Sequence, residues 1–294
     1  MSIKVATRPA ASRADTPSTG SLGPTSRPVS FAGHDHAPMP THDHVTTETD
    51  GHVLHLVLDR PAKKNALTQA MYAALADALE DAATDTAVRA VVLSGRDGVF
   101  TGGNDLGDFM MDPPTGPDSP VFRFLGTAVG FPKPLIAAVE GPAIGIGTTI
   151  LLHCDLAYAS STALFKMPFV DLGLVPEAAS SLLLPRLAGQ VRASELLLFG
   201  EAFSAQTALE VGLLNSIVED PVAHALERAA VLAAKPPSAV RLTKALLRSD
   251  TADAVGATMA REGELFVERL GSPEAEEAFT AFFEKRSPDF SRFD

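Results

Sequence analysis

The chain has 294 residues, of which 46% are hydrophobic and 20% are charged, and its formal net charge at pH 7 is −12. A chain of this length and composition can bury a large core. Because the excess negative charge repels nucleic-acid phosphates and anionic lipid head groups, we expect neither nucleic acid nor a membrane as a partner.

Cysteine usage and the chain ends bear on the cellular compartment. The only cysteine, Cys154, cannot form an intrachain disulfide, which is typical of a reducing compartment. The first residues lack the compact apolar run of a secretion signal, and residues 291–294 do not match a peroxisomal targeting tripeptide. We therefore expect a cytoplasmic protein.

Residues 1–47 are rich in proline, serine, threonine, glycine and alanine and have no sustained apolar period, which predicts a disordered tail. This tail carries His34, His36, His42 and His44 in two His-Asp-His clusters that resemble a metal site. A metal site needs fixed geometry and supporting contacts, which a tail lacks. We therefore expect solvated histidines and no metal.

The ordered part of the chain reads as an α/β protein. Buried strands are predicted at Val53–Leu58, 90–93, Leu135–Val139 and 155–159, and Thr68 is a plausible N-cap for a helix that follows. From residue 177 onward, apolar spacing predicts only helices, at 179–187, 191–199, 204–213, 222–234, 238–247, Ala252–Leu270 and 273–285. We therefore predict a core over residues 48–220 and a helical C-terminal region over 221–294.

One apolar stretch, residues 134–152, approaches the length of a membrane span. It contains Glu140, Pro142 and three glycines, so a buried strand, a tight turn and a helix start explain it better. The run from Asp112 to Pro117 (DPPTGP) predicts a mobile loop, followed by a helix over 119–129.

Several ordered passages carry a family resemblance. They are LDRP at 58–61 with NAL at 65–67, VVLSG at 91–95 with FTGGNDL at 100–106, KPLIAAVEGPAIG at 133–145 and LGLVPE at 172–177. Together they resemble the crotonase (enoyl-CoA hydratase/isomerase) superfamily, with the peroxisomal-type Δ3,Δ2-enoyl-CoA isomerases most similar. The resemblance implies a crotonase fold, which is a spiral of β-β-α units with a helical trimerisation region. It also implies an acyl-CoA substrate, no cofactor, and a homotrimer or hexamer.

The glycines of these passages suit the chemistry of a thioester. A carbon beside the thioester carbonyl becomes acidic only if the enolate oxygen is stabilised, and each backbone N–H of an oxyanion hole is worth about 3 kcal/mol. By their match to the family's motif positions, the backbone N–H groups of Asn104 and Ile146 are implied to form this hole. The alternative from the residues alone is that Gly102, Gly103 and Gly145 serve only tight turns and close packing.

The carboxyl groups favour isomerisation over hydration. The two glutamates of the hydratases match Thr149 and Phe169 here, whereas Glu177 matches the single catalytic glutamate of the isomerases. One carboxylate can remove a proton from C2 and return it to C4. The alternative for Glu177 is a helix-start carboxylate, and Asp171 is a second candidate acid.

The coenzyme A phosphates need a local basic patch on an acidic protein. Arg60, Lys63 and Lys64 supply it in the loop that matches the family's adenine-nucleotide site, and Lys285 and Arg286 are further candidates. The resemblance also implies contacts of substrate with the following residues: Ala66, Thr101, Gly102, Gly103, Asp105, Leu106, Gly145 and Phe169.

The leading prediction is therefore isomerisation of 3-enoyl-CoA to trans-2-enoyl-CoA in fatty-acid β-oxidation. A hydratase or another crotonase-type reaction is the first alternative. The second, of another class, is a non-catalytic acyl-CoA-binding protein that keeps the glycine turns and the basic loop but does not need Glu177.

Overall fold

A six-stranded sheet organises the protein, for which a computed structural model describes residues 43–293. Its strands are β1 (Val45–Asp50), β2 (Val53–Leu58), β3 (Ala90–Gly95), β4 (Leu135–Val139), β6 (Leu156–Ala159) and β9 (Ser216–Ile217), in the spatial order β1-β2-β3-β4-β6-β9. Only β1 runs antiparallel to its neighbour, and the other pairs are parallel. Strands β2 and β4 are buried along their whole length, as expected of parallel strands covered on both faces.

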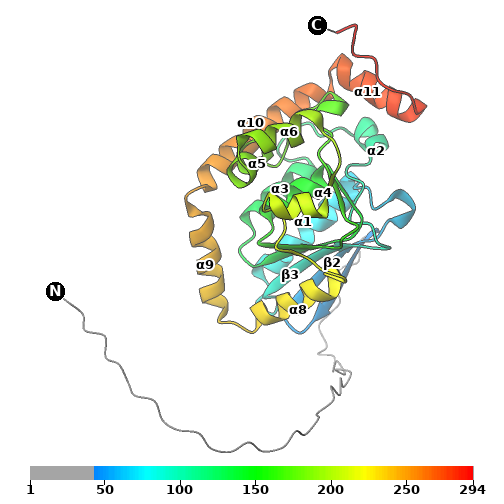
Figure 1. The fold of residues 1–294 in the computed structure, drawn as a ribbon. Coiled ribbons are helices and arrows are strands. Elements are labelled where there is room, and N and C mark those ends of the chain that lie inside the picture. Colours follow the sequence, from blue (N-terminus) through cyan, green and yellow to red (C-terminus); the bar gives the residue numbers. More distant parts are fainter. Residues whose placement is uncertain (1–42, 294) are drawn as a thin grey trace, which may run out of the picture. The chain divides into compact units, whose positions relative to one another are not determined.

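Successive residues of the strands point to opposite faces, and helices cover both faces (Figure 1). On one face, Val53, Val92 and Ile136 pack against α8 (Pro221–Ala233), whose alanines allow a close approach. On the other face the alternate residues join the larger core with α1 (Gln69–Thr84) and α3 (Pro120–Gly130). Both faces of the sheet are therefore buried within one compact unit.

A second, smaller sheet lies beside the site described below. It consists of β5 (Pro142–Ile144), β7 (Leu164–Lys166) and β8 (Phe203–Ser204) in the order β5-β7-β8. The short helices near it are η1 (Pro61–Lys63), α2 (Leu106–Met111), α4 (Ile146–Thr149), η2 (Ile150–His153) and η3 (Val170–Leu172). The apolar stretch over residues 134–152 thus divides into β4, β5, α4 and η2, and no helix in residues 43–293 is long and apolar enough to cross a membrane.

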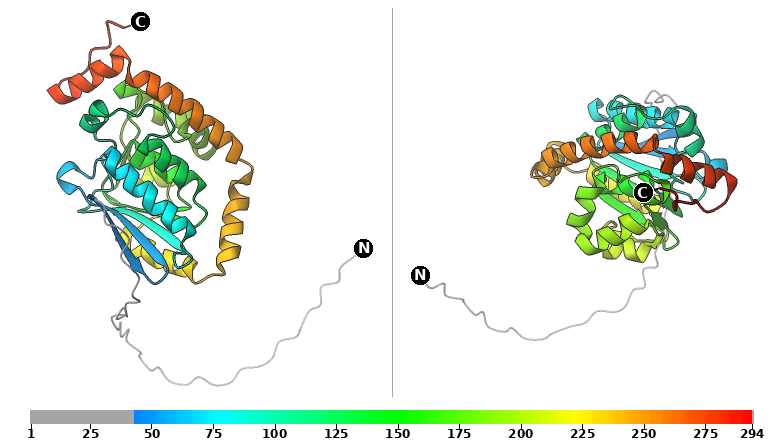
Figure 2. Two further views of the ribbon diagram at one scale, coloured as in Figure 1. Left: turned by 180° about the vertical axis from the view of Figure 1, so that it is seen from behind. Right: turned by 90° about the horizontal axis from the view of Figure 1, so that it is seen from above.

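Helices dominate the rest of the chain, as predicted. They are α5 (Ser180–Ala188), α6 (Gln190–Phe199), α7 (Ala205–Glu210), α9 (Pro237–Ser249), α10 (Ala252–Leu270) and α11 (Pro273–Glu284). Figure 2 shows α9 and α10 extending along one side of the molecule. Lys244 anchors α9 to the core, because its Nζ donates to Asp155 Oδ2 at 2.7 Å and to the Lys133 carbonyl at 2.6 Å.

Two predictions of local structure were wrong. The tail was predicted to extend through residue 47, but β1 begins at Val45 and pairs along its length with β2. Only Val45 of this edge strand is buried, so its threonines and acidic residues gave no apolar pattern. From residue 177 onward only helices were predicted, but the two-residue strands β8 and β9 lie there, and strands this short carry no apolar pattern of their own.

Candidate active site

A cavity of about 380 Å³ opens where the smaller sheet meets α10 and α11. Most of the residues implied by the resemblance to contact substrate or to form the oxyanion hole line it. These are Gly102, Gly103, Asn104, Leu106, Gly145, Ile146 and Phe169. The other side is apolar and comes from the C-terminal helices, including Phe266, Leu270 and Phe279.

The two segments that carry the predicted oxyanion donors are joined through their main chains. Thr101 and Ala143 form a parallel bridge, in which the Ile144 N–H donates to the Thr101 carbonyl at 3.0 Å and the Thr101 N–H donates to the Pro142 carbonyl at 2.9 Å. The Leu67 N–H in turn donates to the Gly103 carbonyl at 2.8 Å. Three stretches far apart in sequence therefore hold one another at the cavity.

Glycine is required on both sides of this arrangement. Gly103 has a φ of 88°, and a Cβ there would lie 2.9 Å from the Ile144 carbonyl oxygen. Gly145 has a φ of 57° and precedes the first residue of α4. An ordinary side chain strains the backbone in this left-handed region, so the glycines do more than permit close packing.

The backbone N–H groups of Asn104 and Ile146 donate to no protein acceptor in residues 43–293. Ile146 begins α4, and the first N–H groups of a helix have no partner within that helix. Both residues line the same cavity. Both predicted donors are therefore available to a ligand in that cavity.

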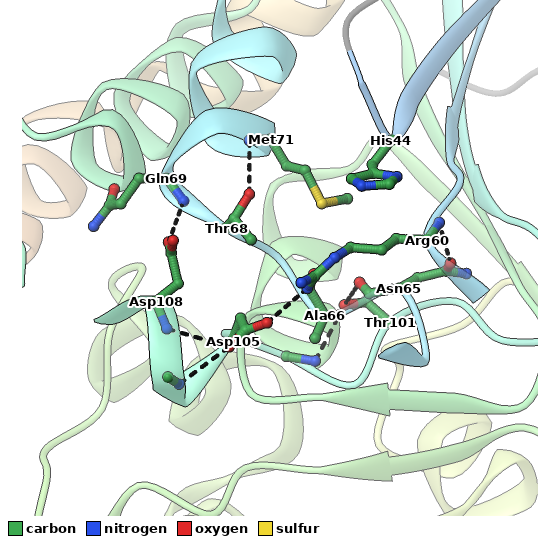
Figure 3. A network of polar contacts seen from close by, with 12 residues as sticks. His44, Arg60, Asn65, Ala66, Thr68, Gln69, Met71, Thr101, Asp105 and Asp108 are labelled. Carbon is green, nitrogen blue, oxygen red and sulfur yellow. Dashed lines mark hydrogen bonds and ion pairs between the residues drawn. The ribbon is translucent and has the colours of Figure 1, made fainter. Parts of the chain in front are cut away.

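A polar network braces the loop that carries Asn104 (Figure 3). Arg60 Nη1 donates to Asp105 Oδ2 at 2.7 Å, and Asp105 accepts the N–H groups of Gly107 and Asp108 at the start of α2. Burial alone would raise the pKa of Asp105, but the hydrogen bonds from Arg60 and Asp108 outweigh it and lower that pKa. Asp105 is thus an ionised brace of the loop.

The basic residues predicted to bind coenzyme A differ in their surroundings. Arg60 also donates to the Ala66 carbonyl at 3.1 Å, so its guanidinium is engaged in the loop network. Lys63 and Lys64 are exposed. Arg286 lines the cavity of its own chain, where it pairs with Glu277 at 2.6 Å.

Glu177 is buried, with 3% of its surface exposed. Its Oε1 accepts a long hydrogen bond of 3.5 Å from Thr149, in the helix that Ile146 begins. Burial raises the pKa of Glu177 to about 8, and the carboxylate of Glu262 adds to this rise. Glu177 is therefore a carboxyl group close to α4 that holds its proton near neutral pH.

The backbone directly after Glu177 is strained. Ala178 and Ala179 have φ values of 58° and 52°, in a region that costs a non-glycine residue about 1 kcal/mol or more. His153 Nε2 donates to the Ala178 carbonyl at 2.7 Å, and burial lowers the pKa of this histidine to about 4. A neutral histidine therefore fastens the turn that carries Glu177.

Not every predicted group lies at the cavity surface. Glu177 is absent from the lining, whereas Asp171 is part of it. Asp171 is half-exposed and forms an ion pair of 3.0 Å with Lys166. The site thus has a buried carboxyl group behind α4 and an exposed, paired one at the cavity surface.

The histidine clusters of the N-terminal segment are only partly described. His34, His36 and His42 lie outside the described residues, while His44 Nδ1 is 3.2 Å from the Asp59 carbonyl. No group of three or more metal-ligating side chains occurs within residues 43–293.

Two residues that contact this site were not predicted. Tyr72 of α1 is fully buried, and its hydroxyl donates to the side-chain oxygen of Asn104. Glu262 of α10 lies near Glu177. Tyr72 belongs to the apolar stripe of its helix and Glu262 to a helix rich in charged residues, so neither had a sequence signal.

Two backbone N–H groups without protein acceptors in residues 43–293 lie in the same region of the fold as a buried carboxyl group. Groups of these two kinds suit an enzyme that stabilises an oxyanion and transfers a proton. Residues 48–292 match the family model described as enoyl-CoA hydratase/isomerase. The chain therefore belongs to the enoyl-CoA hydratase/isomerase family, the crotonase superfamily, whose members act on acyl-CoA thioesters.

Relatives within this family differ in the reactions that their names state. The human protein named enoyl-CoA delta isomerase 2 is 34% identical over 83% of this chain, which spans 64% of the human protein's length. The Escherichia coli protein named 2,3-dehydroadipyl-CoA hydratase is 35% identical over 81% of this chain and 94% of its own.

Solved structures agree on the fold. The Pseudomonas aeruginosa protein OdaA is 48% identical, with a TM-score of 0.80 over 82% of this chain and 98% of its own. An enoyl-CoA hydratase/isomerase from Pseudoalteromonas atlantica is 45% identical, also with a TM-score of 0.80, over 84% of this chain and 99% of its own. The crotonase fold predicted from the motifs is confirmed.

Proposed function

We propose that this protein converts 3-enoyl-CoA to trans-2-enoyl-CoA, with Glu177 as the only proton shuttle. The observation that carries the proposal is the distribution of carboxyl groups around α4. The positions of the two hydratase glutamates hold Thr149 and Phe169, while the carboxyl of Glu177 is buried against Thr149. One acid suffices for isomerisation, whereas the hydratases of this family use two to add water.

The reaction follows from these groups. The Glu177 carboxylate takes a proton from C2 of the substrate, and the electron pair moves onto the thioester oxygen as an enolate. The N–H groups of Asn104 and Ile146 donate to that oxygen, so its charge develops against fixed donors. The enolate then collapses, the double bond moves to C2–C3, and Glu177 returns the proton to C4. Atoms and charge balance without a cofactor.

The pKa of Glu177 suits both halves of this cycle. A group that removes and returns a proton works best when its pKa lies near the working pH. Burial raises the pKa of Glu177 to about 8, which makes the carboxylate a stronger base than an exposed glutamate. The value also means that the rate should rise with pH as this group ionises.

The coenzyme A end of the substrate is assigned to exposed lysines. Lys63 and Lys64 lie three and four residues beyond Arg60, whose ion pair with Asp105 connects that loop to the segment carrying Asn104. Arg286 also lines the cavity, but its guanidinium is already paired with Glu277 and Glu284. The proposed enzyme serves the oxidation of unsaturated fatty acids, which needs 2-enoyl thioesters.

A second candidate function rests on Asp171. It lines the cavity that Glu177 does not line, so a crotonase-type reaction that uses Asp171, including water addition, is the rival. Asp171 is half-exposed and its carboxylate already forms an ion pair with Lys166, whereas Glu177 is buried and has no cationic partner in the described residues. This contrast favours Glu177.

One substrate pair and two variants test the proposal. Purified protein is incubated with 3-hexenoyl-CoA and, separately, with trans-2-hexenoyl-CoA. We expect 2-enoyl product from the first and no 3-hydroxyacyl product from the second. Glu177→Gln should lower the isomerisation rate by about a hundredfold or more, and Asp171→Asn should change it by less than about threefold. Hydrated product, or near wild-type turnover in Glu177→Gln, overturns the proposal.

A further inference from the structure

Glu262 is a buried carboxyl group that the proposed reaction does not use. It lies on α10 with 5% of its surface exposed, and its Oε2 atom has no hydrogen-bond partner in residues 43–293. Burying a carboxyl group with an unsatisfied oxygen is costly. Its location therefore calls for a physical explanation beyond surface charge.

The residue lies on the side of α10 that faces the active site. Phe266 and Leu270 follow Glu262 at intervals of four residues, and both line the cavity. Residues four apart share one face of a helix. Glu262 thus lies one helical turn before Phe266 on the face of α10 that forms the cavity wall. Figures 1 and 2 show α10 running beside α5.

One oxygen of Glu262 holds the segment that follows Glu177. The Ser181 N–H, in the first turn of α5, donates to Glu262 Oε1 at 3.0 Å. The N-cap residue of α5, Ala179, has no side chain able to cap the helix. A carboxylate at a helix N-terminus satisfies a free N–H and matches the helix dipole. Glu262 therefore supplies from α10 the cap that the local sequence lacks.

This cap bears directly on the strained turn. Ala178 and Ala179 occupy the left-handed region between Glu177 and α5. Such a conformation persists only when surrounding contacts enforce it. The Ser180 N–H and hydroxyl both donate to the Glu177 carbonyl, at 3.0 and 2.6 Å. The hydrogen bond from the Ser181 N–H to Glu262 is a further contact that holds this turn.

The charge of Glu262 also acts on Glu177. Burial is the main cause of the raised pKa of Glu177, and the like charge of Glu262 is the second. Burial raises the pKa of Glu262 as well, against hydrogen bonds from Ser181 and Ala179 and the charge of Arg261. Two nearby buried carboxyl groups ionise less readily together than separately.

The other groups around Glu177 do not supply this negative charge. From α1, Tyr72 stays neutral because burial raises the pKa of its hydroxyl well above the usual value. From α4, Thr149 is an uncharged donor. From η2, His153 is neutral near pH 7, since burial lowers its pKa to about 4. Glu262 is the neighbouring ionisable group whose charge adds to the raised pKa of Glu177.

We propose that Glu262 is the positioning residue of Glu177: it caps α5 to hold the turn that carries Glu177, and its charge sets how readily Glu177 gives up its proton. This inference rests on the proposed role of Glu177 as the proton shuttle. Glu262 itself does not touch the substrate in this scheme.

The central test is Glu262→Gln, because glutamine keeps an oxygen for the Ser181 N–H but cannot carry charge. The profile of kcat/KM against pH is measured with 3-hexenoyl-CoA. Removing a like charge lowers the pKa of Glu177, so the rising limb should move to lower pH by roughly half a unit or more. Glu268→Gln, an exposed position on the same helix, makes the same change in net charge and should leave the limb in place.

A second variant separates the cap from the charge. Glu262→Ala removes both, so kcat should fall about tenfold with KM changed by less than about twofold, whereas Glu262→Gln should keep kcat within about threefold of wild type. A purely structural cap predicts no movement of the limb in Glu262→Gln, and that result overturns the inference. If Glu177→Gln keeps full activity, the proposed function fails instead; if Glu177→Gln is inactive and the limb of Glu262→Gln stays in place, only this inference fails.

Discussion

The hydroxyl of Tyr72 donates a hydrogen bond to the side-chain oxygen of Asn104. Asn104 contributes one of the two proposed oxyanion donors, and its backbone N–H has no protein acceptor within residues 43–293. The contact connects α1, in the main core, with the loop that follows Gly103. The orientation of the proposed oxyanion donor therefore depends partly on a buried tyrosine from another element.

Replacing Tyr72 by phenylalanine tests this dependence. The change keeps the packing of the ring against Phe124 but leaves the Asn104 oxygen without its donor. We expect kcat to fall roughly threefold to tenfold, the equivalent of one hydrogen bond, with little change in KM. Steady-state kinetics check this, and Tyr158→Phe, in the core beneath α8, is the matched control. Equal kcat values in the two variants would contradict the role.

The raised pKa of Glu177 predicts how stability changes with pH. Its pKa is about 8 in the folded protein against 4.5 for an unperturbed glutamate, so the folded state binds the extra proton between these values. Stability contributed by this group is present below about pH 4.5 and is lost as the pH rises toward 8. Glu177→Gln should remove that loss, which amounts to roughly a few kcal/mol at pH 8 and above.

Thermal unfolding from pH 5 to pH 9 measures this effect. We expect the Tm of Glu177→Gln to match wild type at the acid end and to exceed it increasingly toward pH 9. Asp171→Asn, at a half-exposed position, should run parallel to wild type. Parallel curves for Glu177→Gln would mean that the folded protein does not hold this group in a buried, proton-retaining state.

The lysines of the loop after Arg60 should govern coenzyme A binding. The double variant Lys63→Glu and Lys64→Glu should raise KM about tenfold at low ionic strength, with kcat changed little, because it repels the phosphates. The effect should shrink as salt is added. Lys235→Glu, at another exposed lysine, is the control, and a KM that does not respond to either charge or salt would rule the loop out as the phosphate site.

Gly103 should tolerate no side chain. The Cβ of Gly103→Ala would lie 2.9 Å from the Ile144 carbonyl oxygen at a φ of 88°, so it would force the two joined segments apart. We expect kcat to fall more than about tenfold and stability to drop by about 1 kcal/mol or more. Gly126→Ala, where nothing lies within 4 Å in helix α3, should instead stabilise the protein by up to about 1 kcal/mol. Kinetics and thermal unfolding distinguish the two.

Much of the fold could be predicted because its signals are local. The bounds predicted for β2 and α10 agree with the structure, since continuous apolar runs and helical spacing are visible in the sequence. Thr68 does cap α1, accepting the Met71 N–H at 3.2 Å. Strand β1 was missed because an exposed edge strand needs only its partner β2, not an apolar pattern of its own.

The site was predictable where it is made of main chain. Gly103 and Gly145 mark the turns that present two N–H groups, and their positions in the motifs are enough to locate them. Contacts between side chains of distant elements were not predictable in the same way. Tyr72 meets Asn104, and Glu262 meets Ser181, only after the helices have packed, and no spacing in the sequence encodes such a meeting.

The joining of residues 101–103 to 142–144 through backbone hydrogen bonds has a consequence for redesign. Since the proposed oxyanion donors are backbone N–H groups, replacing acidic side chains around them does not remove those donors. Thr149 and Phe169 can be exchanged for glutamates to explore water addition, while the backbone donors stay unchanged. A single scaffold of this kind can serve a series of different chemistries by relocating one or two carboxyl groups.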